Sequence, residues 1–303
     1  MSKQKYILPI LALVVANSLW GLNTIFMKIS LETIPPVVSV GVRFFLASLV
    51  ILPFAVKTWK PLKTKYLLLF MLASVFGITL SSLSLNIGLR QVPAFNAAII
   101  WLMAPIVLAV LSAATLREKI SIRTFIGIMI AIAGSMIVIT RANGGAGGTN
   151  SLAANLLIVL SVFFDVIAIL ISKSLMKKVS SYQAGFLNLF PGAIPVLIYA
   201  IIRHGTWGIS SVSRSSAVAF SFSVVVIIIA NVLFYYALRY RQAHTVGVYS
   251  YLDPLLTVVG AWFILSERPA PAFVVGAGLI IAGLCFTELK QAHHYLGHHP
   301  HHR

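Results

Sequence analysis

The chain carries ten long runs of apolar residues, separated by short segments rich in proline, glycine and charged residues. A helix needs about 20 mostly apolar residues to cross a bilayer. The runs are continuous rather than alternating, which favours helices over strands in lipid. The pattern therefore predicts an all-α membrane protein with ten transmembrane helices, at residues 7–27, 36–56, 66–88, 94–116, 122–140, 152–172, 182–202, 216–238, 243–265 and 271–289.

The second half of the chain repeats the first half. Residues 87–138 align without a gap with residues 236–287 at an offset of 149 residues, so that Pro105, for example, recurs as Pro254. Each half holds five spans, an odd number, so the second half must enter the membrane from the opposite side. Inverted repeats are typical of secondary transporters, whose substrate sites lie between the repeats near the bilayer midplane.

The spans divide the chain into four parts. We expect two inverted five-helix repeats at residues 1–142 and 151–290, joined by a Gly-rich external linker at 143–150 and followed by a His-rich cytoplasmic tail at 291–303. A phosphate-binding loop is excluded in the linker, because no Lys followed by Ser or Thr stands at the required spacing.

Composition agrees with a lipid environment. The chain is 59% hydrophobic and 10% charged, whereas a soluble domain is about 25% charged. The first run is too long for the apolar core of a signal peptide. Cys285 is the single cysteine, so no intramolecular disulfide can form.

The net charge of +17 has a topological explanation. Nucleic acid is not an expected partner, because the Lys and Arg residues lie in loops between apolar runs, and most of them fall on one side. Basic loops mark the cytoplasmic side, which places both termini there and the linker outside. The excess charge is expected to bind anionic membrane lipids. The histidines of the tail are interpreted as a solvated segment rather than a metal site, and no cofactor is expected.

Several motifs resemble one known family. The segments 17–28 (NSLWGLNTIFMK) and 42–46 (VRFFL), the Pro-to-Glu pattern that runs from Pro105 to Glu118 and again from Pro254 to Glu267, and the Gly-rich segments 127–139 and 276–286 resemble the EamA branch of the drug/metabolite transporter superfamily. The resemblance covers the chain to about residue 289. It implies a ten-helix exporter of a bacterial inner membrane, acting on amino acids, purines, dyes or other metabolites. Many relatives have Glu before the proline of the ninth helix, where this chain has Asp253.

Three ionisable residues stand out because they lie well inside predicted spans: Arg43, Asp165 and Asp253. Such groups cost at least about 2.5–3.5 kcal/mol each at a helix centre unless paired or solvated. Asp253 and Asp165 are candidates for a proton or substrate ammonium; the alternative for Asp253 is a bond to the irregular backbone beside Pro254. Arg43 either pairs with a substrate carboxylate or locks two helices through backbone carbonyls.

Uncharged polar and aromatic residues complete the candidate site. Amides, hydroxyls and indoles within lipid need an aqueous cavity or a partner helix, although aromatic residues near span ends are often interfacial. A central Trp suits an amphipathic ligand, with core packing as the alternative. The remaining predicted substrate-binding residues are Asn17, Trp20, Asn23, Ser82, Asn86, Asn96, Trp101, Asn231, Tyr235 and Tyr249.

The sequence thus predicts a secondary transporter that exports amino acids or similar zwitterions by alternating access, with protons as a candidate coupling ion. The alternatives are a multidrug or cationic-dye exporter and a nucleotide-sugar or nucleoside transporter. A membrane enzyme or scaffold is less favoured, because the loops are short and no catalytic arrangement is evident. Gly127, Gly134, Gly276 and Gly283 favour close helix contacts, within a monomer or a homodimer. Glu118 and Glu267 are expected to lock helix ends, with Lys119 or Arg268.

Overall fold

The structure is a computed structural model of the chain. It describes residues 3–116, 151–204, 212–241 and 252–267, with parts of 126–137, 246–250 and 271–282. All regular elements in these parts are helices. The predicted linker at 143–150 and the tail at 291–303 lie outside the described residues, as do most of the fifth and tenth predicted spans.

Six of the predicted spans form helices long and apolar enough to cross a membrane among the described residues. They are α1 (Lys3–Ser30), α2 (Pro36–Lys57), α3 with η1 and α4 (Thr64–Ser74, Val75–Ser82 and Leu83–Gln91), α8 (Leu152–Leu175, extended by η2, Met176–Lys178), α9 (Ser181–His204) and α10 (Arg214–Tyr240). Their outer faces are apolar: Ile202 of α9 is 77% exposed and Val218 of α10 is 62% exposed. Side chains of this kind belong in lipid, so the protein is a multi-pass membrane protein.

The fourth predicted span is not one continuous helix, which corrects the sequence interpretation. It divides into α5 (Ala94–Trp101) and α6 (Ala104–Leu116). The backbone between them tightens, as Met103 N–H donates to the carbonyl of Ile100 at 3.0 Å. The break follows from Pro105, which has no N–H for the carbonyl of Trp101 and whose ring clashes with that carbonyl in a regular helix.

The ninth span is described only as α12 (Leu252–Leu265) together with a few residues before it. Here Pro254 lies in the first helical turn, where a missing N–H costs no hydrogen bond. Asp253 lies in the same turn. Pro105 and Pro254 are related by the repeat offset, and in both halves this proline lies in the first turn of a helix, α6 or α12.

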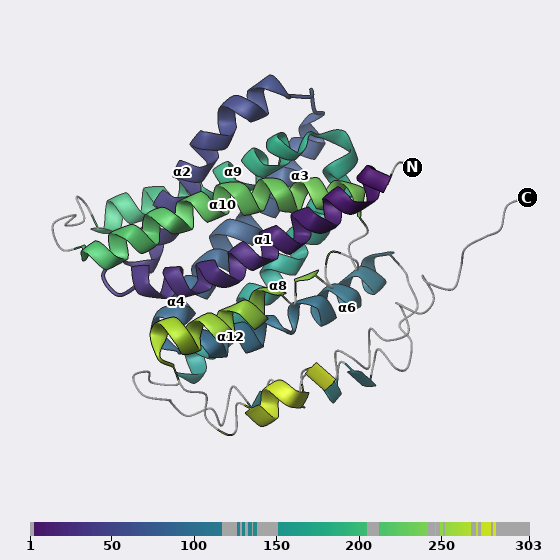
Figure 1. Ribbon diagram of the computed structural model, residues 1–303. Helices are drawn as coiled ribbons and strands as arrows, with labels where there is room; N and C mark the ends of the chain where they lie inside the picture. The colour runs from purple at the N-terminus through teal and green to yellow at the C-terminus, as the bar shows by residue number, and fades with distance from the viewer. Residues whose placement is uncertain are drawn as a thin grey trace, which may run out of the picture.

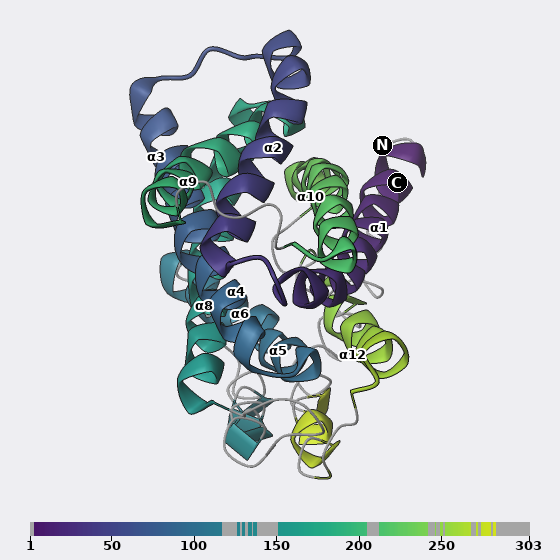
Figure 2. The same ribbon diagram turned by 90° about the vertical axis from the view of Figure 1, so that its left-hand side faces the viewer.

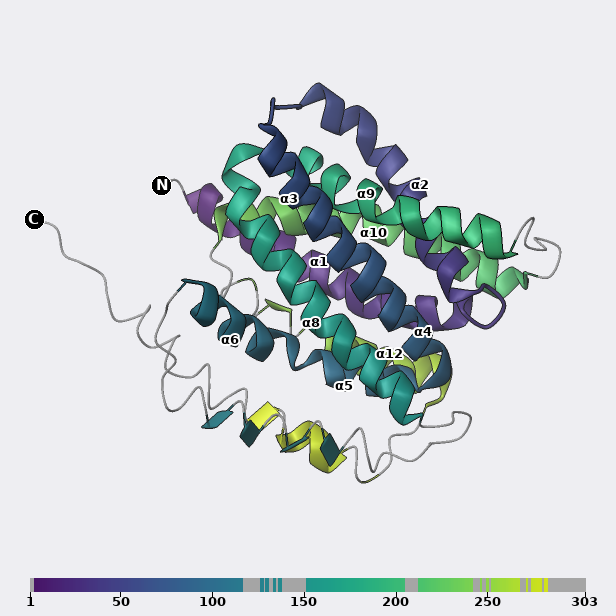
Figure 3. The same ribbon diagram turned by 180° about the vertical axis from the view of Figure 1, so that it is seen from behind.

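The helices pack in two groups (Figure 1). α1 lies along α10 and α12, and α2 lies along α9. Seen from the side, α1, α10 and α12 stand opposite α2, α3, α8 and α9 (Figure 2). From behind, α8 runs alongside the continuous α3–η1–α4 segment (Figure 3), with which it makes extensive contact.

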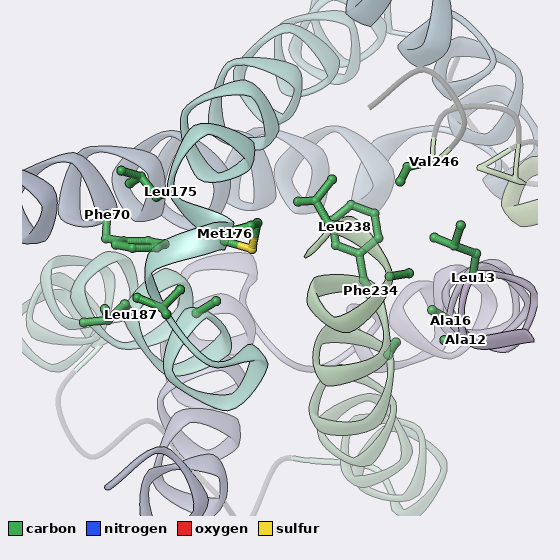
Figure 4. Close-up of a cluster of buried hydrophobic side chains, with 14 of the residues drawn as sticks. Ala12, Leu13, Ala16, Phe70, Leu175, Met176, Leu187, Phe234, Leu238 and Val246 are labelled. Atoms are coloured by element: carbon green, nitrogen blue, oxygen red, sulfur yellow. The ribbon is translucent and has the colours of Figure 1, made fainter. Parts of the chain in front are cut away.

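Two apolar clusters divide the interior along α1. The first joins Leu13 and Ala16 of α1 to Leu175, Met176 and residues of α10 (Figure 4). The second joins the opposite end of α1, at Ile25 and Leu31, to the end of α4 and to α5 and α8. Asn17, Asn23 and Thr24, polar residues of the middle of α1, lie between these clusters.

A π-helical segment, η1, interrupts the third span. Ser74, just before it, inserts its hydroxyl into α9: it accepts from Gly192 N–H at 2.7 Å and donates to the Asn188 carbonyl at 2.6 Å. The hydroxyl thereby replaces one hydrogen bond of α9, beside Pro191 and Pro195. π-Helical turns of this kind are frequent at functional sites.

Candidate functional site

A cavity of about 200 Å³ lies between the two apolar clusters. Its lining residues come from both halves of the sequence, from the α3–η1–α4 segment and from α1, α2, α5, α6, α8, α9, α10 and α12. Most of the residues predicted to bind substrate line it: Asn17, Trp20, Asn23, Arg43, Ser82, Asn86, Trp101, Asp165, Asn231, Tyr235 and Asp253.

Asn96 and Tyr249 are predicted site residues that the structure does not bring to the cavity. On α5 the lining residues are Ala97, Ala98 and Trp101. Asn96 is five positions from Trp101, about 140° around the helix, and is fully buried on another face. Tyr249 packs against the apolar cluster that contains Leu13 and Phe234.

Arg43 is 2% exposed and forms part of a chain of side chains across three helices. Its Nη1 donates to Ser223 Oγ of α10 at 2.9 Å, and Ser223 donates to Asn23 Oδ1 of α1. Its Nε has no hydrogen-bond partner. Of the two predicted roles, the interhelical contact is present, but it goes through a side chain instead of backbone carbonyls. No carboxylate in the described part of the chain lies within ion-pair distance of Arg43.

Asp165 and Asp253 face the same cavity from α8 and α12. Asp253 Oδ1 accepts a long hydrogen bond, 3.3 Å, from Thr257 Oγ1. The same hydroxyl is 3.0 Å from the carbonyl of Gly21. Across the described residues, neither carboxylate has a Lys or Arg partner. The cavity therefore holds a cation and two acids that do not neutralise one another.

Four cavity asparagines share one orientation. Asn17, Asn86, Asn188 and Asn231 each donate their amide NH₂ to the carbonyl four residues earlier, at 2.7, 2.7, 2.9 and 2.9 Å. An amide that donates in this way keeps its oxygen as an acceptor. Asn86 Oδ1 has no partner. Together with the two carboxylates, these groups make much of the cavity wall an acceptor surface.

Trp20 and Trp101 give the cavity aromatic walls. Trp20 packs against Phe234, with ring centroids 5.0 Å apart. The indole Nε1 of Trp101 is buried and has no hydrogen-bond partner. Buried polar atoms are usually paired, so an unpaired donor and an unpaired acceptor in one cavity indicate a place for a ligand or water.

At Gly21, next to Trp20, α1 and α12 are in close contact. A Cβ atom here would lie 2.5 Å from the carbonyl oxygen of Asp253 and 2.9 Å from Leu256 Cβ. Only glycine allows this contact, which sets the position of Asp253 beside the cavity. The Trp-Gly pair of the first span thus has a physical reason.

Sequence reasoning missed Thr24, Asn188, Ser250 and Thr257 as cavity residues. Asn188 Oδ1 accepts from Ser172 Oγ at 2.9 Å. Signals existed for two of them: Asn188 is an amide inside an apolar run that also holds two prolines, and Thr257 lies one helical turn after Asp253. Ser223 was also missed, because it contacts Arg43 without lining the cavity.

Two lysines bind the ends of other helices. Lys28 Nζ donates to the carbonyls of Leu89 at 2.7 Å and Val92 at 2.5 Å. Lys173 Nζ donates to the carbonyls of Leu238, at 2.6 Å, and Arg241. Leu238 and Arg241 follow Leu89 and Val92 by the repeat offset of 149 residues. The two lysines therefore cap equivalent helix ends.

Glu267 has a related role at the start of α5. It accepts from the N–H groups of Ala94 at 3.0 Å and Phe95 at 3.3 Å, which satisfies two free donors at a helix N-terminus. Burial raises the pKa of Glu267, and these hydrogen bonds oppose the rise. Glu118, Lys119 and Arg268, the other residues of the predicted locks, lie outside the described residues.

Comparison with known proteins gives the family. The sequence matches the EamA-like transporter family over residues 7–140 and 152–289. It is 28% identical to the uncharacterized transporter YetK of Bacillus subtilis (strain 168), over 92% of this chain and 86% of YetK. It is 23% identical to a protein of Escherichia coli (strain K12) named "Probable amino-acid metabolite efflux pump", over 94% of each chain.

A solved structure described as "Crystal structure of protein" has the same fold, with a TM-score of 0.67 at 16% identity, covering 93% of this chain and 97% of that chain. The matched segments include both halves of the sequence and all the helices that bound the cavity. The chain belongs to the EamA-like transporter family.

Proposed function

We propose that this chain is a secondary transporter that exports small organic metabolites, with amino acids or similar zwitterions as the leading substrate class. The observation that carries the proposal is the set of unpaired charges in one cavity, Arg43 on α2 and Asp165 and Asp253 on α8 and α12. A buried charge without a partner is costly. A substrate with both a carboxylate and an ammonium group supplies the missing partner for each sign.

Alternating access between two inverted five-helix repeats is the proposed mechanism. Two observations support it: Pro105 and Pro254, which the repeat offset relates, both lie in the first turn of a helix, and Lys28 and Lys173 cap equivalent helix ends. Leu89 and Val92, capped by Lys28, pack with the C-terminal half of α1, whereas Leu238, capped by Lys173, packs with its N-terminal half. Equivalent contacts at opposite ends are what an inverted repeat requires.

The name of the Escherichia coli relative supports amino acids over other classes. A cationic dye remains the second candidate, since two acids and two indoles line the cavity, but Arg43 would then face a cation without an anion. A nucleotide-sugar or nucleoside substrate has less support, because Arg43 is the one cation among the described lining residues. Protons are the proposed coupling ion, and we place the chain in the inner membrane with cytoplasmic termini.

Counterflow in proteoliposomes tests this function. Vesicles loaded with unlabelled substrate are offered radiolabelled leucine, phenylalanine, uridine or a cationic dye at matched and stepped pH. We expect accumulation of an amino acid, and loss of that accumulation in Arg43→Gln. Accumulation of the dye alone would refute the zwitterion assignment, and conversion of a probe without flux would indicate an enzyme.

A further inference from the structure

We propose that Ser223 is a positioning residue that makes Arg43 the binding point for the carboxylate of the substrate. The inference rests on the proposed function of the cavity and specifies how one part of it recognises charge. Ser223 is fully buried and does not line the cavity. Any effect it has on a substrate must therefore pass through Arg43 or Asn23.

The number of protons on each group sets the direction of the hydrogen bonds from Arg43 to Ser223 and from Ser223 to Asn23. A serine hydroxyl has one proton and can accept in two directions. Ser223 gives that proton to Asn23 Oδ1. Its oxygen is then left to accept, which it does from Arg43 Nη1 at 2.9 Å. The guanidinium is thereby held by one of its nitrogens, while Nε stays unpaired.

Asn23 is opposite in polarity to three other cavity asparagines. Asn17, Asn86 and Asn231 use their NH₂ groups within their own helices and keep acceptors free. In Asn188 the NH₂ group also stays within its helix, and its oxygen accepts from Ser172. Asn23 uses its oxygen on Ser223, so its remaining group is a donor. Arg43 carries donors only. The part of the cavity wall around Arg43 and Asn23 is therefore a donor surface in a cavity otherwise rich in acceptors.

This polarity selects an anion. A carboxylate is an acceptor with no donor when ionised, and its hydrogen bonds to a guanidinium are among the stronger ones in proteins. The ammonium group of the same substrate then faces the acceptor surface formed by Asp165, Asp253 and the three amide oxygens. Without the Ser223 hydroxyl, Asn23 loses the donor that fixes its amide, and Arg43 loses the acceptor that fixes its guanidinium.

The test compares binding of three probes to the full chain in lipid nanodiscs. Leucine is the zwitterion, 4-methylpentanoate carries the carboxylate alone, and 3-methylbutylamine carries the amine alone. Binding is followed by the change in tryptophan fluorescence, to which Trp20 and Trp101 contribute from the cavity wall. The variants are Ser223→Ala, Ser223→Thr, which keeps the hydroxyl, and Ser221→Ala as the matched control. Ser221 lies on the same helix but is exposed, and its hydroxyl donates to the carbonyl of Ala217.

We expect Ser223→Ala to weaken leucine and 4-methylpentanoate by about tenfold, the size expected for one hydrogen bond to a charged group, and to leave 3-methylbutylamine unchanged. Ser223→Thr restores most of the carboxylate binding, and Ser221→Ala changes nothing. Equal weakening of all three probes in Ser223→Ala would mean general damage and overturn the proposal. So would unchanged carboxylate binding, or a wild-type protein that binds neither carboxylate probe.

The two proposals can fail separately. If the wild type binds 4-methylpentanoate but not leucine, and Ser223→Ala weakens that binding, the role of Ser223 stands and the zwitterion assignment fails. If leucine is bound and transported but Ser223→Ala binds it normally, the transport function stands and the positioning role fails.

Discussion

At the scale of single residues, the two halves of the cavity differ in charge although their sequences repeat. Asp253 precedes Pro254, and the position that corresponds to it in the first half is Ala104, before Pro105. Both positions line the cavity. Because the repeat keeps the proline but not the acid, the carboxylate before this proline is present in the second half only. Under the proposed function, it is there to meet the ammonium group of the substrate or a proton.

We predict that Asp165→Asn and Asp253→Asn each remove the pH-gradient dependence of export while leaving membrane insertion intact. Asn has the shape of Asp but carries no charge and binds no proton in this range. The measurement is uptake into proteoliposomes with and without a pH step. Glu32→Gln, at an exposed position between α1 and α2, is the control. Gradient-driven export that persists in both Asp variants would show that neither acid takes part in coupling.

Glu267 gives a prediction for stability. Burial raises the pKa of this carboxyl above its ordinary value of 4.5, so the folded state binds its proton more tightly than the unfolded state does. Such a group favours folding below pH 4.5, and that contribution is lost as the pH rises through the raised pKa. Thermal unfolding in detergent should show this loss in the wild type. Glu267→Gln should lose less stability over the same interval, and an identical pH dependence in both proteins would contradict the prediction.

At the scale of helices, the close contact of α1 with α12 sets the geometry of the site. A side chain at position 21 would collide with the backbone of Asp253. We predict that Gly21→Ala moves α12 and reduces transport at least tenfold in inserted protein, since a displacement of about 1 Å can cost that much in positioning. Gly278→Ala is the control, because a Cβ there meets nothing within 4 Å. Normal flux in Gly21→Ala would show that the contact is not needed.

The sequence predicts the helices well where lipid leaves the backbone no alternative. Long apolar runs must be helical to satisfy their own hydrogen bonds, and six of them are. The break before Pro105 was visible in the sequence but was not predicted, because the apolar run continues through it. Side-chain direction is harder. Asn96 and Trp101 both look like site residues, but their helical spacing puts only one of them at the cavity. The role of Ser223 cannot be predicted from the sequence, because small residues are common at helix interfaces and only the structure shows its contact with Arg43.

At the scale of the whole molecule, the cavity lies between two sets of lysine-capped helix ends. Each lysine donates hydrogen bonds to carbonyls that have no partner within their own helix C-terminus. The helix dipole also favours a cation at this end. Lys28 joins the end of α1 to the end of α4, and Lys173 joins the end of α8 to the end of α10. In an alternating-access cycle one end must loosen while the other stays closed. The two lysines are therefore expected to stabilise closure of opposite ends.

This expectation is testable by side-specific labelling. Ser82, a cavity residue, is replaced by Cys in a Cys285→Ser background, and a membrane-impermeant thiol reagent is added from one side at a time. We predict that Lys28→Met raises labelling from the outside and that Lys173→Met raises it from the cytoplasmic side, because each loses two hydrogen bonds to backbone carbonyls. Lys177→Met, in η2 close to Lys173, is the control and should leave both rates unchanged. Equal increases from both sides in both lysine variants would mean loss of overall stability and not opposite closure. A reversed pattern would place the termini outside, since the same contacts would then lie on the other face of the membrane.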